Sequence, residues 1–164
     1  MRVGSYRSAA RARARTPRRG PPRLWVDRRF EMRGFGSVAT GTRIGAALAV
    51  GDEVELHPSG QTHRIRGLQS FGETRDRVEP GARCAVNLQN ATLDDLSRGV
   101  LIAAKEALLR TDRFDASLAW LPEAPALGHD PTSVELLLGT AERRARVAPI
   151  GEEVLECLAD LVGI

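Results

Sequence analysis

The sequence predicts an all-β protein made of a small closed β-barrel followed by a partial second β-barrel. Residues 24–29 have the two-residue period of a strand with one buried face. Gly34 and Gly36 lie close together within a strand pattern, which indicates a bulge or a sharp bend. Short apolar runs with turn clusters between them continue beyond this bend. Strands that bend so soon after they start favour a barrel, because closure removes exposed sheet edges.

Residues 23–106 are expected to form the first barrel, and turn residues separate its strands. The turn signals are Val50-Gly51-Asp52, His57-Pro58-Ser59-Gly60 and Val78-Glu79-Pro80-Gly81. The predicted strands occupy residues 24–29, 37–42, 51–56, 62–71, 83–88 and 100–104. A short helical turn is predicted over residues 92–99, with Thr92 as its cap and Asp94 and Asp95 near its N-terminus.

Residues 107–149 are expected to form a second β-unit that stops halfway through a barrel. Apolar and polar side chains alternate cleanly over residues 114–121. Residues 134–138 and 141–147 predict a hairpin around Gly139-Thr140. A barrel that stops at this point leaves unpaired edges and an open core.

Residues 150–164 are expected to form an amphipathic helix. The apolar residues there fall at positions i, i+1, i+4, i+7 and i+8, with acidic residues elsewhere. These apolar residues are Val154, Leu155, Leu158, Leu161 and Val162. The helix would either cap the half-barrel or come from a shifted reading frame.

Residues 1–22 are rich in Arg, Ala and Pro and are expected to be a disordered basic leader. Residues 1–23 hold eight arginines and no acid, so residues 24–164 carry a net charge of −5. A nucleic-acid-binding arm, an organelle transit peptide and a mis-chosen start codon are the alternatives for the leader. The expected folded part is mildly acidic, so it would bind nucleic acid only through a local basic patch.

The phrase VDRRFEMRGFGSVATGT, followed by VGDEVEL, resembles the start of the second domain of translational GTPases related to elongation factor Tu. The later phrases GLQSFGE, VEPGARCAVNLQN and LSRGVLIA match the rest of that domain. Together with the Asp27-Arg28 pair, they point to the selenocysteine-specific branch. RFDASLAWLPEAP and VELLLGTAERRARV resemble the start of the third domain of that family, which is also a barrel.

This resemblance implies that the chain lacks the GTPase domain, which precedes the second domain in the family and binds GTP and Mg²⁺. The loop from Gly36 to Thr42 has glycines at phosphate-loop spacing, but it lacks the lysine that would reach the phosphates. We therefore expect no GTP hydrolysis, no enzyme activity and no cofactor in this chain. A truncated or frameshifted gene product is a further expectation.

The resemblance also implies a pocket for the selenocysteinyl group, formed by Asp27, Arg28 and Arg83. A selenol is ionised at neutral pH, whereas a serine hydroxyl is not, and two sheltered guanidinium groups would favour the anion. The alternative is that the three residues are solvated charges at strand ends. Arg64 and Arg66, with Arg75 and Arg77, form a candidate strip for tRNA contacts, or a solvated strand face.

Other site classes have little support. His57, His63 and His129 lack ligand spacing, so no metal is expected. Cys84 and Cys157 fit no redox or metal spacing, which suits a reducing cytoplasm. No run of 18 apolar residues predicts a membrane span.

The function predicted first is docking of the aminoacyl end of selenocysteinyl-tRNA during GTP-dependent selenocysteine incorporation. The partners would be selenocysteinyl-tRNA, the ribosome and the GTPase domain of a parent factor. One alternative is a tRNA- or ribosome-binding barrel of another translational GTPase. A second alternative is a protein that binds RNA nonspecifically through its Arg-rich tail.

Overall fold

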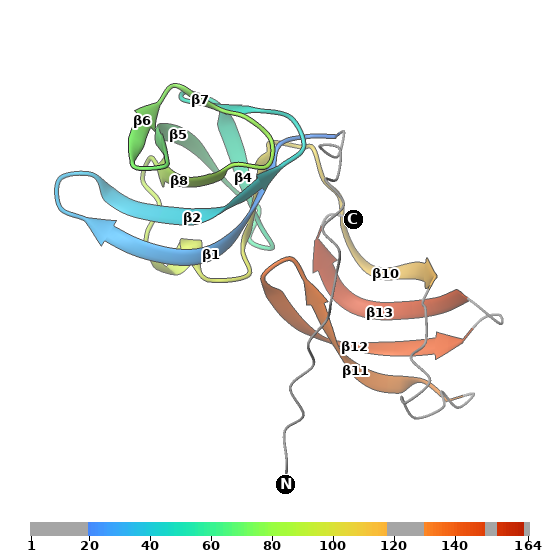
Figure 1. The fold of residues 1–164 in the computed structure, drawn as a ribbon. Helices are drawn as coiled ribbons and strands as arrows, with labels where there is room; N and C mark the ends of the chain where they lie inside the picture. Colours follow the sequence, from blue (N-terminus) through green and yellow to red (C-terminus); the bar gives the residue numbers. More distant parts are fainter. Residues whose placement is uncertain (1–19, 118–129, 150–153, 163–164) are drawn as a thin grey trace, which may run out of the picture.

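The computed structural model of the chain describes residues 20–117, 130–149 and 154–162, and nearly all of these residues lie in or between β-strands (Figure 1). The all-β prediction is confirmed. The predicted leader over residues 1–22 lies almost wholly outside the described residues, as does the end of the alternating run at residues 118–121. No helix in the described part of the chain is long and apolar enough to cross a membrane.

The first sheet closes on itself and forms the predicted barrel. Its strands are β1 (Arg23–Met32), β2 (Gly36–Ile44), β4 (Glu53–His57), β5 (Gln61–Ser70), β8 (Arg83–Leu88) and β9 (Leu101–Ala104). They pair antiparallel in the order β4-β9-β1-β2-β8-β5, and β5 pairs back to β4. The short strand β6 (Glu73–Arg75) extends β5, while β3 (Leu48–Ala49) pairs with β7 (Arg77–Val78).

The barrel core follows from the alternation in these strands. Each strand directs every second side chain inward, and most inward side chains are aliphatic, although the fully buried Arg43 of β2 is not. The buried cluster consists of Leu24, Val26, Ala39, Leu48, Val54, Leu56, Ile65, Leu68, Val78, Cys84, Val86, Leu88, Leu96 and Ile102. Closure thus gives the barrel one continuous core.

Glycines account for two local features of the barrel wall. Gly34 and Gly36 both have φ of 83° and form the sharp bend between β1 and β2, as the sequence predicted. Gly41 lies where β2 packs closely against β1, and a Cβ atom there would be 2.2 Å from the backbone oxygen of Trp25.

The predicted helical turn is the 3₁₀ helix η1 (Asp94–Leu96). The Thr92 backbone N–H donates to Asp95 Oδ2 at 2.8 Å, and the Asp95 N–H donates back to Thr92 Oγ1 at 3.3 Å. This reciprocal pair of hydrogen bonds resembles a capping box. It fixes the loop that leads to Gly99 and Val100 beside β1.

The second sheet has four strands in the order β10-β13-β12-β11. They are β10 (Arg110–Ser117), β11 (Thr132–Leu138), β12 (Ala141–Pro149) and β13 (Val154–Val162). The predicted hairpin at Gly139-Thr140 is confirmed, since Leu138 pairs with Ala141 across this turn. The sheet stays open, with β10 and β11 at its edges.

The predicted C-terminal helix is wrong, because residues 154–162 form strand β13. This strand lies between two others, with Phe114 of β10 and Val147 of β12 both opposite Cys157. Pairing on both sides satisfies the backbone hydrogen bonds of β13, and this tertiary context outweighs the helical spacing of its apolar residues.

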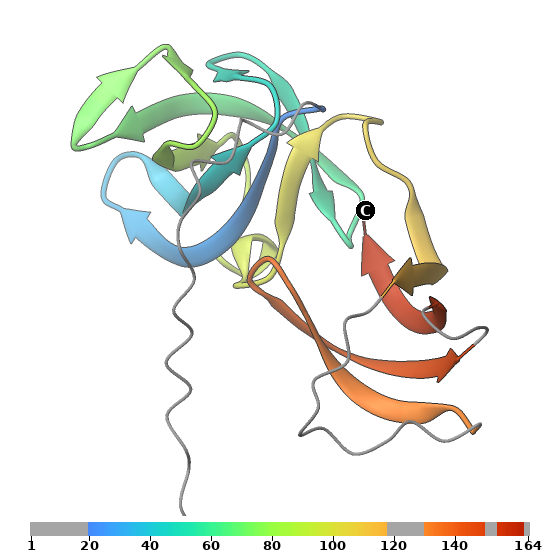
Figure 2. The same ribbon diagram turned by 45° about the vertical axis from the view of Figure 1, so that its right-hand side comes forward.

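The hairpin between β11 and β12 carries its tip to the barrel (Figure 2). The Thr140 hydroxyl donates to the backbone oxygen of Val26 at 2.6 Å. At Gly139, a Cβ atom would lie 2.4 Å from the ring of Trp25, so only glycine leaves room for the indole. The tip therefore contacts β1 next to Asp27.

Candidate functional site

A β-bulge in β1 positions Asp27. The pairing of β1 with β2 shifts register between Val26 and Arg28: Val26 pairs with Gly41 and Arg28 pairs with Thr40. Asp27 is consequently the extra residue, with no partner of its own across the ladder. Bulges often redirect a side chain, and here the bulge directs the carboxylate of Asp27 toward β2 and β8.

The structure brings together two of the three predicted pocket residues, Asp27 and Arg83. Arg83 Nη2 donates to Asp27 Oδ1 at 2.9 Å, and Arg83 Nη1 donates to Oδ2, so the pair is bidentate. The Asp27 side chain is 20% exposed and that of Arg83 is 51% exposed. This geometry makes the site a half-sheltered ion pair on the outer wall of the barrel.

Thr40 is a third member of this cluster, and the sequence analysis missed it as a site residue. Its hydroxyl donates to Asp27 Oδ1 at 2.8 Å, and Arg83 Nη2 lies 3.4 Å from the same hydroxyl oxygen. A threonine is a common strand residue, so its type alone gave no signal. Its place opposite Arg28 in the hairpin register is what could have identified it.

The electrostatics of the cluster favour the ionised forms. Burial alone would raise the pKa of Asp27, but hydrogen bonds from Arg83 and Thr40 and the charges of Arg83 and Arg28 outweigh it and hold this pKa below its ordinary value. The hydrogen bond and charge of Asp27 in turn raise the pKa of Arg83. Asp27 is therefore a carboxylate at neutral pH.

Arg28 lies beside the ion pair but does not join it. Its side chain is exposed, and within the described residues its guanidinium has no hydrogen-bond or ion-pair partner. Arg83 already shares its charge with Asp27, so Arg28 supplies the cation that remains available to a ligand at this place.

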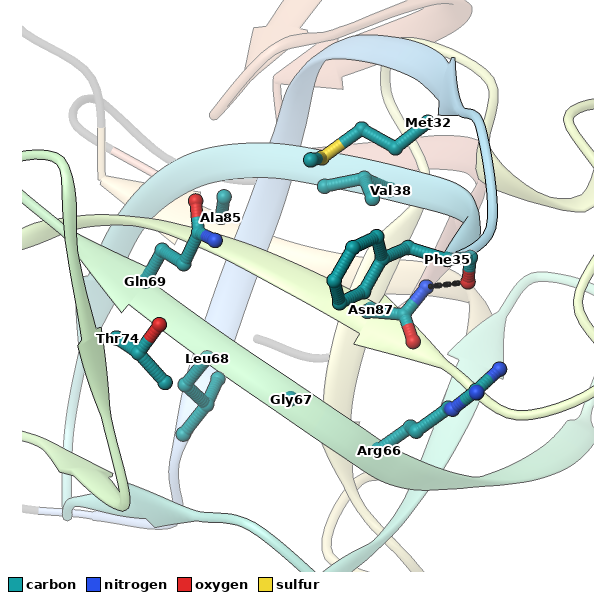
Figure 3. Close-up of a pocket in the computed structure, with 10 residues that line it drawn as sticks. All are labelled: Met32, Phe35, Val38, Arg66, Gly67, Leu68, Gln69, Thr74, Ala85 and Asn87. Carbon is teal, nitrogen blue, oxygen red and sulfur yellow. Dashed lines mark hydrogen bonds between the residues drawn. The ribbon is translucent and has the colours of Figure 1, made fainter.

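A pocket of about 180 Å³ lies on the same wall as the cluster (Figure 3). It is lined by Met32, Phe35, Val38, Arg66, Gly67, Leu68, Gln69, Thr74, Ala85 and Asn87. The lining is largely apolar, and the Phe35 ring stands beside Asn87, with Arg66 at the margin of the group in Figure 3. Phe35 itself is 56% exposed.

Asn87 gives this pocket a polar group with a fixed orientation. Its Nδ2 donates to the backbone oxygens of Phe35 and Ser37 at 2.8 and 2.9 Å. Its Oδ1 is buried and has no hydrogen-bond partner among the described residues. This oxygen has almost no accessible surface, so the contribution of Asn87 is to fix the Phe35 turn beside the pocket.

The cluster and the pocket form one continuous surface. Arg83, Ala85 and Asn87 alternate along β8 and so face the same side of the sheet. Across β2, Thr40 pairs with Ala85, and Val38 pairs with Asn87. At about 3.3 Å per residue, the charged cluster lies about 13 Å along the strand from Asn87.

The four arginines of the predicted strip have different surroundings. Arg64 pairs with Glu53 at 3.6 Å, Arg77 pairs with Glu79 at 2.9 Å, and Arg75 pairs with Glu73. Arg66 has no ion-pair partner in the part of the chain that the structure describes, and it lines the pocket. The arrangement therefore associates Arg66, and not Arg64, with the site. No group of three or more potential metal ligands occurs among the residues described.

The chain is similar in sequence to selenocysteine-specific elongation factors. The chain is 36% identical over 134 residues to a selenocysteine-specific elongation factor of Desulfomicrobium baculatum, and 34% identical over 116 residues to that of Haemophilus influenzae. These matches cover 82% and 70% of the chain but only 21% and 18% of the relatives, so the chain spans about a fifth of their length.

A comparison with solved structures finds the same fold. A crystal structure of a bacterial selenocysteine-specific elongation factor matches 90% of the chain and 24% of its own length, with a TM-score of 0.76 and 22% identity. No protein-family model matches the chain.

Proposed function

Since the chain is homologous to the selenocysteine-specific elongation factors and corresponds to about a fifth of their length, we propose that it docks the aminoacyl end of selenocysteinyl-tRNA during selenocysteine incorporation. The observation that carries this proposal is the cluster of Asp27, Arg83 and Thr40 beside the unpaired Arg28. The cluster offers both signs of charge within a small, half-sheltered area.

The cluster suits a ligand that has an ammonium group and an anionic side chain. A selenolate would accept charge-assisted hydrogen bonds from Arg28 and from the exposed edge of Arg83. The ammonium group of the amino acid would approach the carboxylate of Asp27. A serine hydroxyl carries no charge, so it would leave the cationic side of the site unsatisfied, and this difference is the proposed source of selectivity.

The pocket between Phe35 and Asn87 suits the terminal base of the tRNA. Proteins hold unpaired bases by stacking them on aromatic side chains and by hydrogen bonds to their edges. Phe35 is available for stacking, and Met32 and Val38 supply apolar walls. Arg66 is placed to meet a phosphate.

The other partners follow from this proposal. Delivery of an aminoacyl-tRNA requires a ribosome in the cytoplasm and a GTPase domain, which would hold GTP and Mg²⁺ on the same longer polypeptide or on a separate one. This chain would contribute recognition of the amino acid.

The test compares binding of selenocysteinyl-tRNA and seryl-tRNA that share one tRNA body. Arg28→Ala and Arg83→Ala should each weaken selenocysteinyl-tRNA binding by about tenfold or more, as expected for the loss of a charge-assisted hydrogen bond, with much less effect on seryl-tRNA. Arg144→Ala is the matched control, because Arg144 is an exposed arginine of β12 outside the cluster and the candidate tRNA strip. An equal loss for both tRNAs would favour the barrel of a translational GTPase that binds ordinary aminoacyl-tRNA.

A further inference from the structure

The peptide between Val26 and Asp27 is held by hydrogen bonds from the loop after η1 and from the second sheet. The Val26 oxygen accepts the Gly99 N–H at 3.0 Å and the Thr140 hydroxyl at 2.6 Å. The preceding peptide, between Trp25 and Val26, is also held, because the Val26 N–H donates to the Val100 oxygen at 2.9 Å. Two of these bonds come from the loop after η1, and the third comes from the second sheet.

The bulge makes these bonds important for the orientation of Asp27. Asp27 is the unpaired residue between two ladder positions, so the pairing of β1 and β2 does not itself fix its backbone. Rotation of the Val26–Asp27 peptide would turn the Cα–Cβ bond of Asp27. The carboxylate would then lose its bidentate contact with Arg83. This contact requires both carboxylate oxygens of Asp27 to lie in the plane of the Arg83 guanidinium group.

The hairpin tip is built to reach this peptide closely. Gly139 has φ of 62° and leaves space for the Trp25 ring, and Gly99 leaves space for Ala141, whose Cα would be 3.0 Å from a Cβ at position 99. Glycines on both sides of the contact bring the Thr140 hydroxyl to the bulge. Thr140 is half-buried there, and Ala141 is buried.

We propose that Thr140 is a positioning residue for the aminoacyl site: its hydroxyl fixes the Val26–Asp27 peptide and thereby aligns Asp27 with Arg83. The geometry of the site in the first barrel thus depends on the docked second sheet. An effect of Thr140 on tRNA selectivity rests on the proposed function. The effect of Thr140 on the alignment of Asp27 with Arg83 does not.

The alignment is tested without tRNA, by following the Asp27 carboxyl carbon with NMR during a pH titration of the full chain. Thr140→Val keeps the shape of the side chain and removes the hydroxyl. It should raise the pKa of Asp27 toward its ordinary value. The hydrogen bonds from Arg83 and Thr40 and the charges of Arg83 and Arg28 hold this pKa down, and they weaken when the carboxylate is misaligned. Thr140→Ser should preserve the wild-type pKa.

Thr132→Val is the control, because it removes a hydroxyl from the same hairpin far from the tip. Gly139→Ala is a second, independent variant that should displace the tip through the Trp25 ring and shift the pKa of Asp27 in the same direction. If Thr140→Val does not fold, the pKa of Asp27 in Gly139→Ala tests the proposal in its place. An unchanged pKa of Asp27 in the folded Thr140→Val protein, or an equal shift in Thr140→Val and Thr140→Ser, would overturn the proposal.

Binding measurements separate this proposal from the proposed function. Thr140→Val should reduce the preference for selenocysteinyl-tRNA over seryl-tRNA by about fivefold, a coupling of ordinary size. If the pKa of Asp27 shifts while Arg83→Ala leaves this preference unchanged, the positioning role stands and the proposed function fails.

Discussion

The barrel and the four-stranded sheet use the same kind of strand but differ in how they bury it. Every barrel strand has a neighbour on both sides, and the inward side chains form one continuous core. Among the described residues the sheet has two open edges, and in β11 and β12 only Ala141, Ala145 and Val147 are buried apolar side chains. Leu137 is 68% exposed. On this comparison of β11 and β12 with the barrel, we expect closure to place more of the stability in the barrel.

The largest expected effect is at Gly41, where β2 packs closely against β1 inside the barrel. Gly41→Ala would place a Cβ atom 2.2 Å from the Trp25 oxygen and 2.7 Å from Leu24 Cδ2, and a backbone atom cannot easily move away. We expect a loss of about 3 kcal/mol or more in the free energy of unfolding, measured by urea denaturation. Gly67→Ala is the control, since nothing lies within 4 Å of its Cβ position and the change should cost little.

A pair of leucines compares the two regions directly. Leu56 in the barrel is 0% exposed, and Leu136 in the sheet is partly buried. Leu56→Ala should cost about 3 kcal/mol, and Leu136→Ala about 1 kcal/mol, because a cavity forms only where the surroundings cannot relax or admit water. Equal costs in urea denaturation would show that the open sheet packs as tightly as the barrel.

The smallest expected effect concerns the ion pair on the barrel wall. The pKa of Asp27 is lowered in the folded protein, so its contribution is present above the ordinary carboxyl pKa and disappears as pH falls through the lowered one. Half of the Arg83 side chain is exposed, so the pair should contribute only about 1 kcal/mol.

The difference in unfolding free energy between wild type and Asp27→Asn should therefore be constant near pH 7 and shrink below about pH 4. Asp76→Asn, at an exposed position in the barrel region, provides the control. A difference that does not change with pH would assign the effect of Asp27→Asn to shape instead of charge.

The features that the sequence predicted well are those with a local signature. Alternation and turn residues predicted the barrel, and Gly139-Thr140 predicted the hairpin. The Asp27 and Arg83 pair came from a motif resemblance, because 56 residues separate the two along the chain and no local pattern links them.

The features that were missed depend on tertiary context. Residues 154–162 fit a helix by spacing, and pairing with β10 and β12 makes them a strand. The pocket gathers residues from several strands and a turn that lie far apart in the sequence, and no local pattern links them. Thr40 and Thr140 are ordinary in sequence, and only the bulge at Asp27 gives their hydroxyls a role.

The most direct test of the account is the affinity of the full chain for selenocysteinyl-tRNA and seryl-tRNA built on the same tRNA, which differ in a single atom. The cluster of Asp27, Arg28 and Arg83 predicts that the chain binds the selenium form at least about tenfold more tightly at neutral pH. Equal affinities would contradict the account, because the charged residues of the cluster would then not distinguish the selenolate from the serine hydroxyl.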